Sequence, residues 1–282
     1  MIKLCAFSDE AASSLEGQIA ALRRNGIPYM EIRNVDGKNI KDISLDEARS
    51  IKRILDENNI KVWSVGSPLG KVDIDTDLDE YMQVVCHILE IAKILECDRI
   101  RMFSFFKAYD KSEKVMEYLK KMVKKAATYN IKLCHENEKD IFGDTAERNL
   151  QILENVPGLC YVYDPANFLQ VGEEAKKTLS LLADKAEYFH IKDVISETGE
   201  LVPAGEGDGR ISDIIASVIG DKVLTLEPHL TVFTGYTAID STEMKNKYAF
   251  DSNDATFDAA VVALKGLLAD AGYIEKEGGF TK

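Results

Sequence analysis

The chain alternates between short runs of strand composition and longer stretches with apolar residues at helical spacing. The short runs are four to six residues long and rich in Val, Ile, Leu, Phe and Tyr, which is typical of buried strands in a parallel sheet. The predicted strands are 3–7, 28–33, 61–65, 99–103, 131–136, 160–163, 188–191 and 222–226.

Each predicted strand is followed by a segment whose apolar residues return every three or four positions, which predicts an amphipathic helix. In the first of these, Leu15, Ile19 and Leu22 lie on one face, and Gly26 ends the helix. Ser44 and Glu47 form a capping-box pattern at the start of the second. The predicted helices cover about 15–26, 44–58, 77–95, 112–129, 145–154, 173–182, 211–219 and 254–271.

Eight strand–helix units in 282 residues predict an α/β fold, a single (β/α)8 TIM barrel. A doubly wound open sheet is the competing fold. It usually has fewer strands and a glycine-rich turn after the first one, where this chain has Ser8-Asp-Glu-Ala. No Pro-, Gly- or Ser-rich linker divides the chain, so we expect one domain over 1–282. The segment 231–251 is long for a loop and is expected to be a lid or a subunit contact.

Composition narrows the classes of function. With 48 acidic and 35 basic residues, the net charge of −13 repels phosphate backbones and disfavours nucleic-acid binding. No apolar run reaches about 18 residues, which argues against a membrane span. The N-terminal residues MIKLCAFSDE resemble a first strand, not a signal peptide. Five scattered cysteines without a CxxC pair are expected to be buried free thiols of a cytoplasmic protein.

Acidic and histidine side chains stand at the ends of four successive predicted strands. They are Glu136, Asp164, His190 and Glu227. Strand C-termini meet at the active-site face of a barrel. Three carboxylates there would repel each other unless a cation lies between them. Oxygen ligands with one imidazole suit Mn²⁺, Mg²⁺, Co²⁺ or Zn²⁺, so the sequence predicts one divalent metal ion without choosing among these.

The motifs around these residues resemble the xylose isomerase-like superfamily of sugar isomerases and epimerases. The matching segments are Glu136-Asn-Glu138, Asp164-Pro-Ala-Asn167, His190-Ile-Lys-Asp193, Gly205-Glu-Gly-Asp208 and Leu226-Glu-Pro-His229. The order Glu, Asp, His, Glu is that family's metal-site order, and the resemblance covers nearly the whole chain.

The resemblance implies a metal-dependent isomerase or epimerase acting on a sugar or a sugar phosphate. In epimerases similar to D-tagatose 3-epimerase, two metal-bound glutamates transfer a proton next to a carbonyl, through an enediolate. Glu136 and Glu227 match those positions. Asp164 and His190 would be ligands only. The chain departs from the epimerase pattern at Asn167, where those enzymes have a histidine, and at Ser196, where they have an arginine.

Further rim residues are expected to contact a sugar or polyol substrate. These are Asn167, Lys192, His229, Glu31 and Arg101, with Arg33 and Lys107 nearby. A salt bridge between Lys192 and Asp193 is an alternative for that lysine, and a place in a loop behind the substrate is the alternative for His229. His135 alternates with Glu136 along its strand and should pack behind the barrel, and His87 should be structural.

Three other functions stay open at this point. A keto-polyol dehydratase, similar to inosose dehydratase, would use the same ligands and begin with the same proton abstraction. The superfamily's endonuclease branch needs more histidines than the four present, and its DNA substrate is disfavoured by the acidic charge. A non-catalytic sugar-binding barrel would not need an intact metal set. Family members often form dimers or tetramers, so a homo-oligomer is an expectation by analogy.

Overall fold

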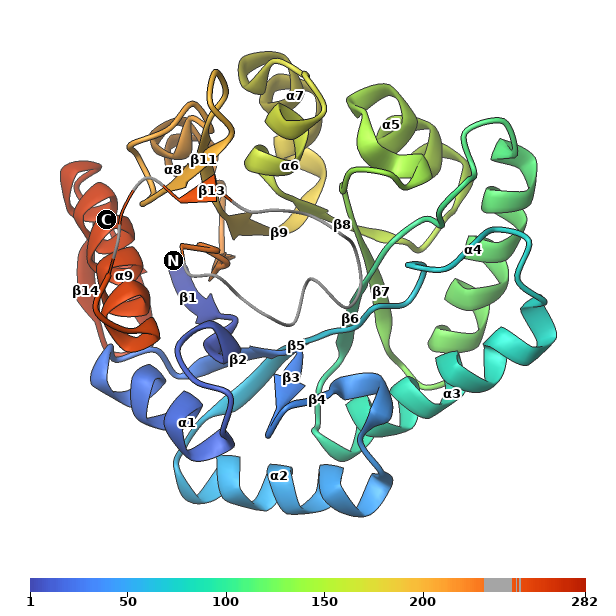
Figure 1. Ribbon diagram of the computed structural model, residues 1–282, viewed down its shortest axis with the longest axis horizontal. Coiled ribbons are helices and arrows are strands. Elements are labelled where there is room, and N and C mark those ends of the chain that lie inside the picture. The colour runs from blue at the N-terminus through green and yellow to red at the C-terminus, as the bar shows by residue number, and fades with distance from the viewer. Residues whose placement is uncertain (231–244, 247, 249) are drawn as a thin grey trace.

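The central element of the computed structural model is a closed barrel of parallel strands. The structure describes residues 1–230, 245, 246, 248 and 250–282. The barrel strands are β1 (Ile2–Ala6), β2 (Tyr29–Ile32), β5 (Lys61–Gly66), β6 (Arg99–Met102), β7 (Lys132–Glu136), β8 (Cys160–Tyr163), β9 (Ala186–Ile191) and β12 (Lys222–Leu226). Because β12 pairs in parallel with β1, the sheet closes (Figure 1), and the predicted TIM barrel is confirmed.

A ring of helices surrounds the barrel (Figure 1). The helices are α1 (Leu15–Arg24), α2 (Leu45–Glu57), α3 (Leu78–Ile94), α4 (Ser112–Ala127), α5 (Ala146–Asn155), α6 (Pro165–Gln170), α7 (Ala175–Leu182), α8 (Ile211–Ser217) and α9 (Asn253–Asp270). Single 3-10 turns occupy Ser8–Glu10, Ile40–Asp42, Phe142–Asp144 and Ala183–Lys185. The predicted capping box of α2 is present, with Ser44 and Glu47 each accepting from the other's backbone.

The sequence patterns did not predict several short strands. A C-terminal hairpin of β14 (Ile274–Lys276) and β15 (Gly279–Thr281) adds to the outside of β1. A three-stranded sheet joins β10 (Asp193–Ile195), β11 (Glu200–Val202) and β13 (Lys245–Asn246), and β3 (Asn34–Val35) pairs with β4 (Lys38–Asn39). These segments are only two or three residues long, which is too short for a period of two to show. Most of the predicted lid or subunit contact at 231–251 lies outside the described residues.

The barrel interior is layered along the strands. An inner apolar cluster contains Cys5, Cys134, Val162, Tyr188 and Val223. Because side chains alternate along a strand, the residues two positions later point to the same side, and these include three of the four predicted ligands. The larger apolar core lies between the strands and the helices. Among the described residues, no helix has the length and apolar character needed to cross a bilayer.

Candidate metal centre

The four predicted ligands converge at one point at the C-terminal ends of β7, β8, β9 and β12. Glu136, Asp164, His190 and Glu227 each offer one ligand atom, and these atoms lie within 4.8 Å of one another. The Nδ1 atom of His190 is 3.0 Å from Glu136 Oε1 and 3.1 Å from Glu227 Oε2. All four side chains are buried. The spacing of the atoms is that of a site for a single ion.

Asp164 is held by the start of a helix. It is the N-cap of α6, where Oδ1 accepts a hydrogen bond from the Asn167 N–H and Pro165 occupies the first turn. Asn137 fixes the backbone beside it, since its Oδ1 accepts from the Asp164 N–H and its Nδ2 donates to the Asp164 carbonyl. With Oδ1 used by the cap, Oδ2 is the oxygen left for a metal.

The imidazole of His190 is oriented from behind by Glu31. Glu31 Oε2 lies 3.2 Å from His190 Nε2, and the hydroxyl of Tyr188 donates to Glu31 Oε1. Nε2 therefore carries the proton that faces Glu31, which leaves Nδ1 to face the other ligands, the arrangement usual for metal-bound histidines. Burial disfavours the charged imidazole, but Glu136, Glu31 and Glu227 outweigh it and raise the pKa of His190 well above its ordinary value.

Buried cations tie the carboxylates to fixed positions. Arg33 forms a two-point ion pair with Asp9 and contacts Glu227 Oε1 at 2.9 Å. Arg101 lies 3.2 Å from Glu136 Oε2. Lys192 Nζ lies 3.0 Å from Asp164 Oδ2 and 4.0 Å from Glu227 Oε2. The Lys192–Asp193 salt bridge considered from sequence is therefore replaced by a Lys192–Asp164 pair, because neighbouring strand residues point to opposite sides.

A second possible ligand group adjoins the first. Glu10, Glu227 and His229 also bring ligand atoms within 4.8 Å of one another. The guanidinium of Arg33 already contacts two of them, Glu227 at 2.9 Å and Glu10 at 3.4 Å. Arg33 therefore places a fixed positive charge against two members of this second group.

The charge balance of the site fits a divalent cation. Among the described residues, the buried carboxylates around the centre are those of Asp9, Glu10, Glu31, Glu136, Asp164 and Glu227, and the buried cations are Arg33, Arg101 and Lys192. Six carboxylates and three cations leave an excess of three negative charges. Burial raises the pKa of Glu10 to about 8, and the surrounding carboxylates raise the pKa of His190 well above its ordinary value, so protons on these groups reduce the excess when no ion is bound. Buried negative charge of this kind requires a partner, and a divalent cation that displaces such protons can supply it.

Of the other residues that the sequence suggested, some lie beside the four converging side chains and others lie away from them. Asn167 Nδ2 lies 3.3 Å from Glu136 Oε1, and His229 is buried with Nε2 3.4 Å from Glu10 Oε1. Lys107 is exposed and pairs with Asp73. His135 is buried behind the strand against Gly143, as predicted, and burial lowers its pKa to about 3. The ring of His87 contacts the Ile43 carbonyl at 2.9 Å, a structural role.

Sequence reasoning missed Asp9, Asn137 and Lys71. Asn137 directly follows β7 and Asp9 lies three residues past the end of β1, so the strand-end rule applied to every strand would have found them. Lys71 pairs with Glu138 at 3.1 Å and lies over the Phe103 ring. It comes from a loop after β5, where no local pattern marks it.

Asp193 organises the glycine-rich loop that follows β11. Its Oδ2 accepts from the N–H groups of Gly205 and Gly207, and its Oδ1 accepts from those of Gly209 and Val194. A Cβ atom on Gly207 would collide with the Asp193 carboxylate, which explains the glycine there. The loop is thus an anion-binding nest filled by the protein's own carboxylate.

We expect Asp193→Asn to lower the free energy of unfolding by about 2–4 kcal/mol, because the amide keeps one acceptor oxygen and turns an NH2 group toward backbone donors. Thermal unfolding should shift down by roughly 5–10 °C. Asp208→Asn is the control, since Asp208 is exposed in the same loop and accepts only from the Ser196 N–H in the described contacts. Equal effects of the two substitutions on the melting temperature would contradict this role for Asp193.

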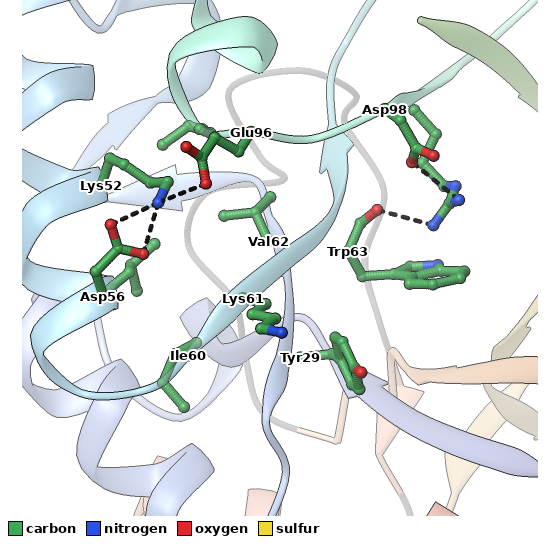
Figure 2. Close-up of a pocket in the computed structure, with 12 residues that line it drawn as sticks. Tyr29, Lys52, Asp56, Ile60, Lys61, Val62, Trp63, Glu96 and Asp98 are labelled. Carbon is green, nitrogen blue, oxygen red and sulfur yellow. Dashed lines mark hydrogen bonds and ion pairs between the residues drawn. The ribbon is translucent and has the colours of Figure 1, made fainter. Parts of the chain in front are cut away.

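A separate pocket of about 420 Å³ lies at the opposite end of the strands (Figure 2). Tyr29, Lys61 and Trp63 line it from the starts of β2 and β5, and Lys52 bridges Asp56 and Glu96 at its edge. The Arg99 guanidinium stacks on Trp63 at 3.6 Å. None of the metal-centre residues lines this pocket, and this end of a TIM barrel usually serves stability.

Comparison with solved structures supports the fold. The 3-DHS dehydratase AsbF from Bacillus anthracis has a TM-score of 0.70 and 16% identity, over 95% of this chain and 98% of that one. A D-allulose 3-epimerase from Methylomonas sp. in complex with D-allulose has 0.71 and 16%, over 94% and 96%. The IolI protein with a bound zinc atom has 0.68 and 17%, over 95% and 98%. No curated protein matches the chain.

The family model described as xylose isomerase-like TIM barrel matches residues 19–232. That range spans most of the barrel and includes all four converging side chains. The chain therefore belongs to the xylose isomerase-like TIM-barrel family.

Proposed function

We propose that this protein is a divalent-metal-dependent isomerase or epimerase that moves a proton next to the carbonyl of a sugar. The observation that carries the proposal is the convergence of Glu136, Asp164, His190 and Glu227 on one buried point. Relatives in fold include sugar epimerases and a dehydratase. A divalent ion bound by these residues would supply Lewis-acid polarisation of substrate oxygens.

Glu136 and Glu227 are the proposed proton carriers. They come from β7 and β12, which are separated by two strands in the barrel, so their carboxylates reach the centre from different directions. Burial opposes ionisation of Glu227, but Lys192 and His190 outweigh it and hold its pKa well below the ordinary value. Glu227 therefore stays ionised and able to accept a proton, while Arg33 fixes its other oxygen.

The residues around these glutamates suit the binding of substrate hydroxyls. Asn167 and His229 are neutral hydrogen-bonding groups next to Glu136 and Glu227, respectively. Burial lowers the pKa of His229 well below its ordinary value, so its imidazole is neutral. Arg101 and Lys192 also remain candidates for substrate binding. Each orients a carboxylate of the centre, Glu136 and Asp164 respectively. Both carboxylate oxygens of Glu31, by contrast, already contact His190 and Tyr188. We therefore propose that Glu31 orients the His190 imidazole and does not bind substrate.

The charges around the site favour an uncharged sugar over a sugar phosphate. Among the described residues, the three buried cations near the centre are ion-paired, Arg33 with Asp9, Arg101 with Glu136 and Lys192 with Asp164, and the largely buried Lys71 pairs with Glu138. TIM barrels commonly bind phosphate at the loops after strands seven and eight. Here the loop amides donate to Asp193 instead.

We therefore expect free ketoses to be converted with a kcat/KM at least about 100-fold higher than that of their phosphates, since like-charge contacts cost several kcal/mol. Steady-state assays of a ketose panel, each member paired with its phosphate ester, measure the ratio. A preference for the phosphate esters would contradict the proposed substrate charge without bearing on the metal centre.

Metal binding by the protein can be measured directly. The purified protein, stripped with a chelator and resupplied with Mn²⁺, Mg²⁺, Co²⁺ or Zn²⁺, should bind about one ion per chain because Arg33 neutralises the adjoining ligand group. Elemental mass spectrometry gives the stoichiometry. Absence of bound metal at millimolar supply would refute the proposed function.

The reaction class is tested separately from the metal. In deuterated water, an isomerase or epimerase incorporates deuterium next to the substrate carbonyl and keeps every hydroxyl, and NMR of the product detects both features. Loss of a hydroxyl from the product would instead assign the protein to the dehydratases. Both reactions begin with the same proton abstraction, so only the product distinguishes them.

A further inference from the structure

Two cysteines face each other in the lower part of the barrel interior. Cys134 in β7 and Cys160, the first residue of β8, are direct partners in the register of these parallel strands. Cys134 belongs to the inner apolar cluster, and Cys160 packs against the same cluster. Both side chains therefore point into the barrel next to each other.

The register of the two strands is compatible with a covalent bond between them. Neighbouring strands lie about 4.7–4.9 Å apart, which falls inside the Cα separation of about 4.4–6.8 Å found in disulfides. We infer that Cys134 and Cys160 are a redox modification site, at which a peroxide oxidant converts the two thiols into a reversible intramolecular disulfide.

The two thiols differ in access, which sets the order of the steps. Cys134 is fully buried, whereas Cys160 is partly exposed at the strand start. Its interaction with the neighbouring Cys134 thiol, aided by Lys132 and Arg99, outweighs burial and lowers the pKa of Cys160. Because Cys160 has more thiolate character and is more accessible, its sulfur is the one that reacts first with the oxidant.

The chemistry balances with a peroxide as the oxidant. The Cys160 thiolate attacks one oxygen of hydrogen peroxide, forming a sulfenic acid and releasing hydroxide, which is protonated to water. The Cys134 sulfur then attacks the Cys160 sulfur, forming the S–S bond and expelling a second water. Two thiols are oxidised by two electrons in total, and one peroxide is reduced to two waters. A thiol reductant reverses the reaction by exchange.

Peptide mapping tests the inference directly and does not depend on the proposed function. After treatment of the native protein with hydrogen peroxide, a non-reducing tryptic digest should contain the peptide with Cys134 joined to the peptide with Cys160, and dithiothreitol should separate them. Cys86→Ser is the matched control, since Cys86 is partly exposed on α3 and the variant should form the same link. Cys160→Ser should abolish it.

Cys134→Ser separates a true pair from two independent thiols. Without its partner, Cys160 should stop at the sulfenic acid and be trapped by dimedone, which the wild type should resist. A wild-type map in which Cys160 is overoxidised, joined to another cysteine, or no more reactive than Cys86 would overturn the inference. This map needs no variant, so the test stands even where a substitution prevents folding.

Discussion

Glu227→Gln should lower kcat by about 10⁴-fold, the upper end of the range for a lost acid–base group. The substitution removes a proposed proton carrier and a proposed metal ligand while keeping the size of the side chain. Metal affinity should fall by at least about 100-fold, because loss of a residue that only hydrogen-bonds a ligand already costs about 10- to 100-fold. Steady-state kinetics and metal titration of the stripped protein measure the two effects.

The control for this variant is Glu187→Gln. Glu187 lies in β9 near the strand start, is half-buried and pairs with Lys132, far from the converging ligands. It should leave metal stoichiometry and kcat unchanged. If Glu227→Gln retains full metal affinity and activity with an unchanged melting temperature, Glu227 has neither role, and the proposed proton-transfer pair is wrong.

Metal affinity should fall steeply as the pH is lowered below about 7, by about tenfold for each pH unit. Burial raises the pKa of Asp164 to about 7, although Lys192 opposes the shift. A metal binds the ionised carboxylate, so each proton taken up below that pKa competes with the metal. The pKa of His190, raised by the surrounding carboxylates, adds competition of the same sign. Titrations of the stripped protein with Mn²⁺ between about pH 5 and 8 measure the dependence.

Lys192→Met provides a directional check on that dependence. Lys192 is the cation that lowers the pKa of Asp164, so its removal should move the loss of metal affinity to higher pH. Lys107→Met, an exposed lysine paired with Asp73, should leave the curve in place. A wild-type affinity that does not change between about pH 5 and 7 would contradict the assignment of Asp164 as a ligand.

The barrel and the strand-end positions of the four ligands were predictable from sequence for a common reason. Strands and helices differ in the spacing of their apolar residues, and eight alternations leave few topologies. Once the strands are placed, the rule that parallel strands end at one face brings Glu136, Asp164, His190 and Glu227 together without any distance being known. Short edge elements such as β10 and β14 were missed because two or three residues carry no period.

The partners of the ligands were not predictable in the same way. Arg33 and Glu227 are 194 positions apart and meet only because β12 closes onto β1. Glu31 was expected to touch substrate, whereas the structure places it against His190. Lys192 was considered for a salt bridge with the next residue, and the structure pairs it with Asp164 instead. Each contact depends on barrel closure and on the direction of a side chain across neighbouring strands.

The elements, their order and the face at which the acidic residues gather could thus be predicted from local periodicity and chain order. The three-dimensional structure was needed to show which charges neutralise each other, which nitrogen of His190 faces the other carboxylates, and that Arg33 contacts both Glu10 and Glu227. Electrostatic interactions depend on distance and burial, and both arise only when strands far apart in the chain become neighbours.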